Sequence, residues 1–240
     1  MTPKICISLF KQNFEELVEK VHSVANDADI LEIRLDALYR PGFSLVPSHI
    51  KAIKEALSYK NVRLLFTNRR KEEGGSFLGD ETQRIEWLKA AIVEGVHIID
   101  IELGTEGNLR DEVIKATHQH DTKVIVSFHD FFTTPPLSRL KDIFNQARGI
   151  GADIVKVVTT PLSSDDLLGP LNLYPMANKT RTALIAFSMG EIGKITRIMS
   201  ISLGAPFIYC APAEGAGTAP GQMDAQTVKA IFHKMSQSFS

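Results

Sequence analysis

Eight short β-rich runs alternate with helical stretches along the whole 240-residue chain. The runs cover 4–9, 29–36, 62–67, 97–102, 122–128, 153–159, 181–188 and 206–211. Between them, apolar residues recur with helical spacing, most clearly over 13–25, 81–95, 137–149 and 224–236. Such alternation indicates a parallel sheet with crossover helices, and eight units is the number that closes a (β/α)8 barrel.

An open, doubly wound sheet is the alternative arrangement for this pattern. It usually has fewer strands, and no GxGxxG fingerprint follows the first run, which removes the main argument for a dinucleotide fold. No linker-like boundary interrupts the chain, and its length suits one barrel. We therefore predict an α/β protein with a single (β/α)8 TIM barrel domain over 1–240, without an N-terminal hairpin covering the barrel.

The charge balance limits the partners. The formal net charge is −1, which gives no electrostatic case for nucleic acid or an anionic membrane. No apolar run reaches the length of a membrane span, and the first one is too short for a signal peptide, so we expect a cytoplasmic protein.

Cys6 and Cys210 lie in apolar runs and fit buried, reduced thiols. No Cys or His pair near them has zinc-ligand spacing, so no metal site is expected.

Polar side chains gather where the predicted strands end, which is where barrel enzymes place their active sites. Alternation along a strand puts residues i, i+2 and i+4 on one face. The residues at these ends are Ser8; Glu32, Arg34 and Asp36; Arg69; Asp100 and Glu102; His129 and Asp130; Lys156; and Ser188.

Each of these residues also has a purely structural interpretation. Asp36 fits a structural ion-pair row as well as a site, and for Asp100 and Glu102 the structural interpretation is the better one. A lone His129 would be a hydrogen-bonded core histidine, and Lys156 could extend its ammonium to the rim. The structural interpretations weaken when the residues are taken together, because buried charges are costly unless they are paired or functional.

Lys156 carries the sharpest chemical signal. It lies in the apolar run ADIVKVV, where desolvation and nearby arginines disfavour the ammonium form. A neutral amine can form an imine with a ketone or aldehyde, and the imine acidifies the neighbouring C–H. His129 can remove that proton near neutral pH, and a carboxylate can fix the tautomer of its ring. Lysine, histidine and carboxylate form a complete set for elimination or aldol chemistry beside a carbonyl.

From end to end the chain resembles the type I 3-dehydroquinate dehydratase family. The matching motifs, in order, are EIRLD at 32–36, TxR at 67–69 leading to EGG at 73–75, DxE at 100–102, SxHDF at 127–131, GADIxK at 151–156, SM at 188–189, TR at 196–197 and TAPGQ at 218–222. Each motif is short, but their order and their presence in almost every unit of the barrel are specific.

The resemblance implies dehydration of 3-dehydroquinate to 3-dehydroshikimate, in the shikimate route to aromatic amino acids, with no metal or added cofactor. It implies that Lys156 forms an imine with the C3 ketone, that His129 moves a proton from C2 to the departing C1 hydroxyl, and that Glu73 orients His129. It also implies substrate-binding roles for a further set of residues: Ser8, Glu32, Arg34, Arg69, Met189, Arg197, Thr218 and Gln222. Among these, Arg197 would bind the substrate carboxylate.

Three departures from the family pattern stand out, one of which is the missing N-terminal hairpin that covers the barrel in some relatives. Thr196 and Thr218 replace serines that many relatives carry, which keeps the hydroxyls. Tyr209 stands where an apolar aromatic residue is common. The glycine-rich stretch 212–222 is interpreted as a lid, or else as an ordinary βα loop. Relatives are often homodimers, so a homodimer is the expected partner state, although the sequence shows no interface stripe.

Two other functions compete with the dehydratase. A class I aldolase also uses an imine-forming lysine, but it would need a phosphate site, for which SMGEIGK at 188–194 is a weak candidate. A non-catalytic barrel binding module would have lost the lysine, the histidine or the glutamate, and all three are present.

Overall fold

The computed structural model describes residues 2–57 and 60–237. Its eight strands are all parallel and form one curled sheet in the order β7-β6-β5-β4-β3-β2-β1-β8. Their bounds are β1 Ile5–Leu9, β2 Ile30–Arg34, β3 Arg63–Thr67, β4 Ile98–Glu102, β5 Lys123–His129, β6 Ile154–Thr159, β7 Ala183–Ser188 and β8 Ile208–Cys210. With helices in the connections, this is the predicted single (β/α)8 barrel.

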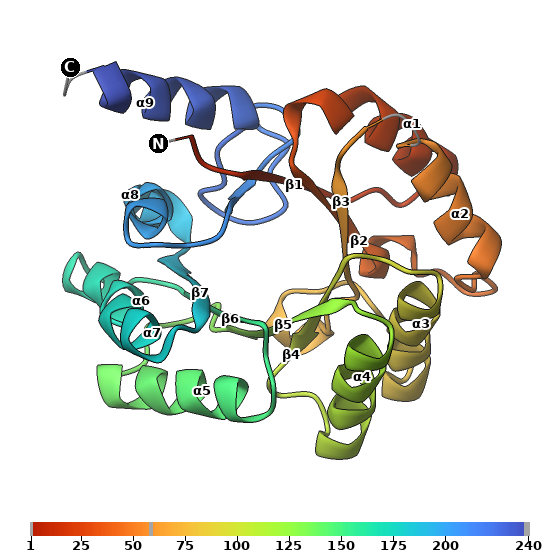
Figure 1. Cartoon of the computed structure of the whole chain (residues 1–240), viewed down its shortest axis with the longest axis horizontal. Helices are drawn as coiled ribbons and strands as arrows, with labels where there is room; N and C mark the ends of the chain where they lie inside the picture. The colour runs from red at the N-terminus through yellow and green to blue at the C-terminus, as the bar shows by residue number, and fades with distance from the viewer. Residues whose placement is uncertain (1, 58–59, 238–240) are drawn as a thin grey trace.

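Helices surround the strands on the outside (Figure 1). Their bounds are α1 Phe14–Val24, α2 Pro47–Glu55, α3 Glu81–Val93, α4 Gly107–Gln119, α5 Leu137–Gly149, α6 Leu168–Leu171, α7 Tyr174–Thr180, α8 Gly190–Ser202 and α9 Ala225–Gln237. Short 3-10 helices are η1 Ala25–Asp27, η2 Leu35–Leu38, η3 Lys71–Glu73 and η4 Asp165–Leu167. Among the described residues no helix has the length and apolar character needed to cross a bilayer.

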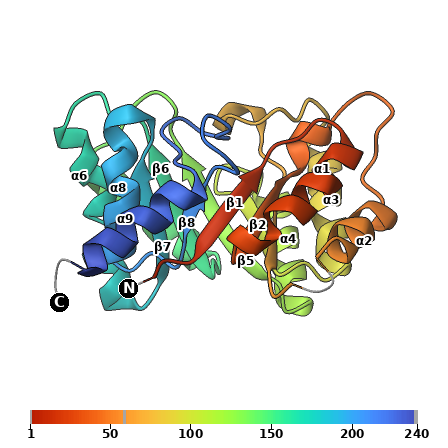
Figure 2. The ribbon, with the colours of Figure 1, turned by 90° about the horizontal axis from the view of Figure 1, so that it is seen from above.

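β7 and β8 are the two edge strands of the curled sheet, and they face each other across a seam. A loop, rather than hydrogen bonds between the two strands, connects the two sides of this seam. No strand pairing joins β7 to β8 within 2–57 and 60–237. Instead, Pro220 in the loop after β8 accepts hydrogen bonds from the Gly190 backbone N–H at 3.2 Å and from Arg197 at 3.0 Å. This loop lies at the upper edge of the barrel in Figure 2, above β8 and beside α8. The seam is therefore built from the same segment that the sequence marks as a candidate lid.

The barrel interior has an apolar floor and a polar mouth. Each strand contributes at least one buried apolar or aromatic side chain to the inner cluster, and the lower layer consists of Cys6, Ile30, Leu65, Ile98, Ile125, Ile154, Ile185 and Tyr209. The next inward positions, two residues further along β1, β2, β4 and β6, are Ser8, Glu32, Asp100 and Lys156. Because side chains alternate along a strand, these polar groups share the interior with the floor beneath them.

Local capping follows the sequence closely. The side chain of Asp80 accepts a hydrogen bond from Gln83 N at 2.7 Å and so caps α3. Two predicted boundaries are wrong in ways that affect the site. Asp36 lies in η2 rather than at the end of β2, and His129 is the last residue of β5 rather than the residue after it. Cys6 and Cys210 are free and buried, as expected.

Candidate active site

A cavity opens into the barrel at the carboxyl ends of the strands. About 80 Å³ of it is accessible to the centre of a water-sized sphere. Most residues proposed from the sequence line it, and Phe131, Val158 and Phe187 add apolar walls. The lining residues that the sequence proposed are Glu32, Arg34, Arg69, Glu73, His129, Lys156, Met189, Arg197, Thr218 and Gln222, and Tyr209 lines the cavity as well. Ser8 lies beneath them and contacts the lining through Glu32 and Thr218.

Lys156 lies at the bottom of this cavity and is only 6% exposed. Its Nζ donates a hydrogen bond to Asp100 Oδ2 at 3.0 Å, and it lies 4.3 Å from the centre of the Tyr209 ring. The ion-pair partner of the amine is thus a carboxylate, whereas the sequence led us to expect arginines near it. The nearest charge is a carboxylate, which also suits a nitrogen that remains cationic as a protonated imine.

Asp100 belongs to a row of buried ion pairs behind the lysine. Arg69 donates to Asp100 at 3.0 Å and to Glu102 at 2.8 Å, and Arg84 donates to the other oxygen of Glu102 at 2.8 Å. Burial alone would raise the pKa of Asp100, but Arg69 and Lys156 outweigh it and lower that pKa to about 2. Asp100 therefore remains ionised beside the lysine at any pH near neutrality.

His129 and Glu73 form a second buried pair at the mouth. Glu73 Oε2 lies 3.0 Å from His129 Nδ1 and also accepts the His129 backbone N–H at 2.9 Å. Burial is the largest cause that lowers the pKa of His129 well below its usual value, and Arg69, Lys156 and Arg34 add to it. Burial, followed by Glu102, raises the pKa of Glu73 to about 8. A neutral imidazole with Nδ1–H bonded to Glu73 Oε2 leaves Nε2 able to accept a proton.

The two glycines after Glu73 explain how it reaches His129. Gly74 has φ +78°, and a Cβ there would lie 2.3 Å from Phe131. A Cβ on Gly75 would lie 1.9 Å from the Arg69 carbonyl oxygen. Only glycine fits this turn, which folds back on the end of β3 and places the Glu73 carboxylate against β5.

Register sets the spacing between lysine and histidine. In the β5–β6 ladder Ser127 pairs with Lys156 and His129 pairs with Val158. His129 therefore lies on the neighbouring strand and two residues nearer the mouth, which separates its Cα from that of Lys156 by about 8 Å. A small ring held between the two side chains could contact both.

A chain of hydroxyl and carboxylate hydrogen bonds forms the opposite wall. Ser8 Oγ and Thr67 Oγ1 donate to the two oxygens of Glu32, and Thr218 Oγ1 donates to Ser8 Oγ at 3.0 Å. Gln222 accepts from the Thr218 backbone N–H at 2.7 Å, which ties the loop to itself. These groups offer donors and acceptors of the kind that bind ring hydroxyls.

Arg34 and Arg197 present guanidinium groups to the cavity in different environments. Arg34 makes two hydrogen bonds to Asp36, at 2.8 and 2.7 Å, so Asp36 fixes the position of that side chain. Arg197 is 2% exposed, stacks 4.2 Å from the centre of the Phe187 ring, and has no buried carboxylate partner among the described residues. Its Nε has no hydrogen-bond partner there, and burial lowers its pKa to about 10. This guanidinium is suited to bind an incoming anion.

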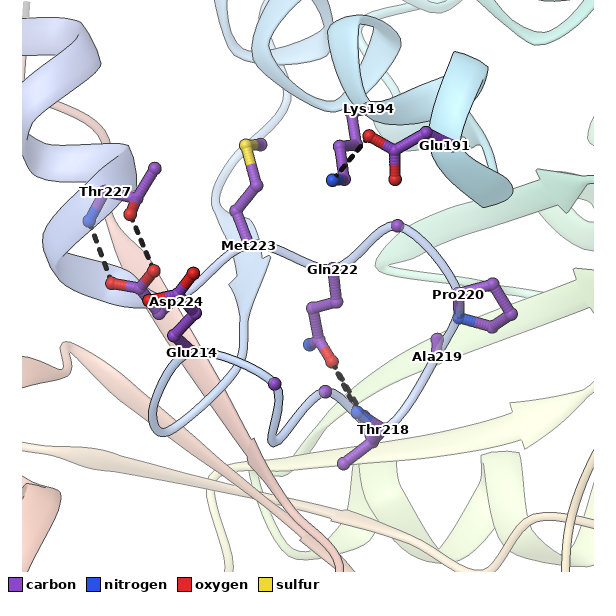
Figure 3. Close-up of a pocket in the computed structure, with 13 residues that line it drawn as sticks. Glu191, Lys194, Glu214, Thr218, Ala219, Pro220, Gln222, Met223, Asp224 and Thr227 are labelled. Atoms are coloured by element: carbon purple, nitrogen blue, oxygen red, sulfur yellow. Dashed lines mark hydrogen bonds and ion pairs between the residues drawn. The ribbon is translucent and has the colours of Figure 1, made fainter.

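A larger hollow of about 680 Å³ lies on the outer side of the loop after β8. Figure 3 shows it between that loop and α8, with Gln222 pointing to Thr218 and Lys194 paired with Glu191. Glu214 and Asp224 also line it, so its surroundings are acidic and unsuited to phosphate. It contains neither Lys156 nor His129, and we assign the chemistry to the inner cavity despite its smaller volume.

Comparison with known proteins agrees with this geometry. Residues 5–238 match the family model described as type I 3-dehydroquinase. The chain belongs to this family. A 3-dehydroquinate dehydratase of Methanothermobacter thermautotrophicus is 35% identical over 98% of both chains, and one of Methanosarcina barkeri is 37% identical over 85% of this chain and 84% of its own. A crystal structure of the type I enzyme from Clostridium difficile, with covalently modified comenic acid, superposes with TM-score 0.84 and 28% identity, covering 97% of this chain and 93% of that one.

The type I 3-dehydroquinase motifs thus converge from separate barrel units on one cavity. Sequence reasoning underrated Asp100, for which it favoured a purely structural role and which contacts Lys156 directly. It missed Arg84, on α3, which anchors Glu102. The strand pattern contained a signal for Asp100, because it is a charged residue at an inward position of β4, and only β5 lies between β4 and β6, the strand of Lys156. Nothing comparable marked Arg84, since a helix arginine is ordinarily exposed.

Proposed function

We propose that this protein dehydrates 3-dehydroquinate to 3-dehydroshikimate through an imine on Lys156, as a step of the shikimate route to aromatic amino acids. Membership of the type I 3-dehydroquinase family supports the reaction. The observation that carries the mechanism is the buried Lys156 amine, paired with Asp100 and one strand away from the His129–Glu73 pair. The proposal needs neither a metal nor an added cofactor.

The steps follow from the positions of these groups. Lys156 Nζ attacks the C3 carbonyl carbon, and loss of water gives a protonated imine whose charge Asp100 balances. His129 Nε2 then takes a proton from C2, and the electron pair forms the enamine. The C1–O bond breaks as His129 returns the proton to the leaving hydroxyl, which departs as water. Hydrolysis of the imine releases the product and restores the lysine.

The remaining lining residues would hold the substrate. Arg197 would bind the carboxylate at C1, because its guanidinium is buried and lacks an anionic partner. Glu32, Arg34 and Arg69 would hold ring hydroxyls, Ser8, Thr218 and Gln222 would complete the polar wall, and Met189 would pack against the ring. The loop 212–222 would act as a lid, since it borders the cavity through Thr218 and Gln222.

Trapping of the covalent intermediate tests the function. The protein is mixed with 3-dehydroquinate and sodium borohydride, and intact mass is followed by peptide mapping. We expect one stable adduct, on Lys156, and formation of a conjugated ketone in untreated reactions. Absence of both the adduct and the dehydrated product would overturn the proposal. A class I aldolase would instead give an adduct with an aldol donor, and the acidic surroundings of Lys194 argue against the phosphate site that it would need.

Replacing Arg197 with methionine should raise KM far more than it lowers kcat. Loss of one partner from a buried charge pair typically costs at least about 2 kcal/mol, so kcat/KM should fall by roughly 30-fold or more. Initial rates over a range of substrate concentrations measure this. Arg181, at the end of α7, is a control arginine whose replacement by methionine should leave KM unchanged. An Arg197→Met enzyme with wild-type KM would exclude the carboxylate role.

We further propose a cytoplasmic homodimer. Support for self-association comes from α8 and the residue that caps its end, which expose Ile192, Ile195, Met199 and Leu203. Their spacing puts them on one helix face, and contiguous exposed apolar residues mark interaction surfaces. Ile195→Lys should therefore shift the molecular mass measured by light scattering from dimer to monomer. Val93→Lys, at an exposed apolar position on α3, is the matched control; equal masses for all three proteins would contradict this interface.

A further inference from the structure

Arg84 is a fully buried arginine on α3, a helix on the outside of the barrel (Figure 1). Every nitrogen of its guanidinium has an acceptor. Nε and Nη2 donate to the two oxygens of Glu81 at 2.7 and 2.8 Å, and Nη2 also donates to Thr105 at 2.9 Å. Nη1 donates to Glu102 at 2.8 Å and to the Asn68 carbonyl. Replacing buried ion pairs with apolar residues is often neutral or stabilising, so stability alone does not account for this arginine.

Arg84 holds the segment that directly follows β3 from two sides. It donates to the carbonyl of Asn68, and the Asn68 side-chain amide donates back to the Arg84 carbonyl at 3.1 Å. It also reaches the next two residues through Glu102. The other oxygen of Glu102 accepts from the Arg69 guanidinium at 2.8 Å and from the Arg70 backbone N–H at 3.2 Å. Arg84 therefore fixes the start of this segment.

One arm of the segment leads to Lys156 through side chains. Arg69 donates to Asp100 at 3.0 Å, and Asp100 accepts from the Lys156 ammonium at 3.0 Å. In the described part of the chain, the cations paired with Glu102 are Arg69 and Arg84. Without Arg84, the two buried carboxylates would compete for Arg69, because each would depend on the charge of that one guanidinium.

The other arm leads to His129 through the backbone. The Arg70 carbonyl accepts from the backbone N–H groups of Glu73 at 3.2 Å and of Gly75 at 2.9 Å, which closes the turn that carries Glu73. The Oε2 atom of Glu73 lies 3.0 Å from His129 Nδ1. Arg84 is not among the described residues that line the cavity, so its effect on the reaction would pass through these two arms.

We propose that Arg84 is a positioning residue for the imine reaction. One arm keeps Asp100 against Lys156. The other keeps Glu73 against His129. A displacement of about 1 Å in reacting groups can cost about 10²-fold in rate, so a residue outside the cavity controls kcat without touching the substrate. The inference rests on the proposed function, because it assigns Arg84 a part in the imine cycle.

Arg84→Met tests this role, because methionine occupies similar space without the charge or the donors. We expect kcat to fall by roughly 10- to 100-fold and KM to change by less than about threefold, since the residues proposed to bind the substrate stay in place. Borohydride should still trap the adduct on Lys156. Arg84→Lys keeps a cation for Glu102 but cannot hold Asn68 and Thr105 as well. Its kcat should therefore exceed that of Arg84→Met and lie about threefold or more below wild type.

The measurements separate positioning from stability. Rates are taken at one temperature below the melting transition of every variant, with circular dichroism to confirm that each is folded. A merely structural role would lower the melting temperature and leave the kcat of the folded protein at the wild-type value. Arg110→Met is the matched control, since Arg110 lies on α4 and donates to the carbonyl of Leu103, the residue after Glu102, at 2.8 Å. This control should keep the wild-type kcat.

Wild-type kcat in folded Arg84→Met would overturn the proposal. If the methionine variant does not fold, wild-type kcat in Arg84→Lys would overturn it. A change confined to KM, or an equal loss of kcat in Arg110→Met, would do the same. Wild-type protein that yields neither adduct nor product would instead count against the proposed function itself.

Discussion

Replacing Lys156 with alanine is expected to abolish covalent trapping and to lower kcat by on the order of 10⁴-fold or more, the scale seen when an enzyme loses its covalent nucleophile. The expectation follows from position, because this amine lies inside the cavity, with Asp100 as its ionic partner. Without it no iminium can form, so the C2 proton loses the group that acidifies it. The measurement is single-turnover product formation together with intact mass after borohydride.

The variant should still fold. Asp100 keeps Arg69 at 3.0 Å and Ser127 at 2.6 Å when the lysine is gone, so its charge is not left unpaired. Lys194→Ala removes a lysine of the outer hollow that is paired with exposed Glu191, and it should behave as wild type. A Lys156→Ala protein with native circular dichroism and full activity would rule out the imine mechanism.

Replacing His129 with alanine is expected to separate imine formation from proton transfer. Loss of a general acid–base group typically lowers the rate by about 10²–10⁴-fold, so kcat should fall by that amount. Lys156 and Asp100 remain, and the borohydride adduct should therefore still form, with the mass of the substrate rather than the product. Adduct mass and the rate of product formation report the two events independently.

The pH profile supplies a second measurement for His129. Burial, together with Arg69, Lys156 and Arg34, lowers the pKa of this imidazole. As the pH falls, the ring therefore takes up its proton only after the pH has dropped below the usual histidine pKa of about 6.5. The acid limb of kcat/KM in the wild-type enzyme should accordingly have its midpoint below 6.5, and the part due to His129 should be missing in His129→Ala. His118→Ala, at the exposed end of α4, should keep the wild-type profile. A midpoint at or above 6.5 in the wild type would contradict the structure.

Hydrophobic periodicity was sufficient to predict the barrel. Alternation in strands and helical spacing between them are local properties, and eight parallel strands follow from the order of the runs. Motif order was likewise enough to propose Lys156, His129 and Glu73. The ends of the strands were predicted less well, as Asp36 and His129 show. Whether a terminal residue belongs to a strand or to the following turn depends on its contacts with neighbouring segments, which the local sequence does not contain.

Partnerships between distant residues were decided only by the tertiary structure. The 56 residues that separate Asp100 from Lys156 give no local sign that their side chains meet at 3.0 Å. The order of β4, β5 and β6 in the sheet brings the two side chains together inside the barrel, although their backbones are two residues out of step in the register. The amine, which the sequence led us to expect near arginines, is paired with a carboxylate. The contact of Arg84 with Glu102 emerged in the same way, since it joins a helix to the end of a strand. The linear order of residues thus determined the fold and the chemical groups, whereas packing across the barrel decided which charges and hydroxyls face one another.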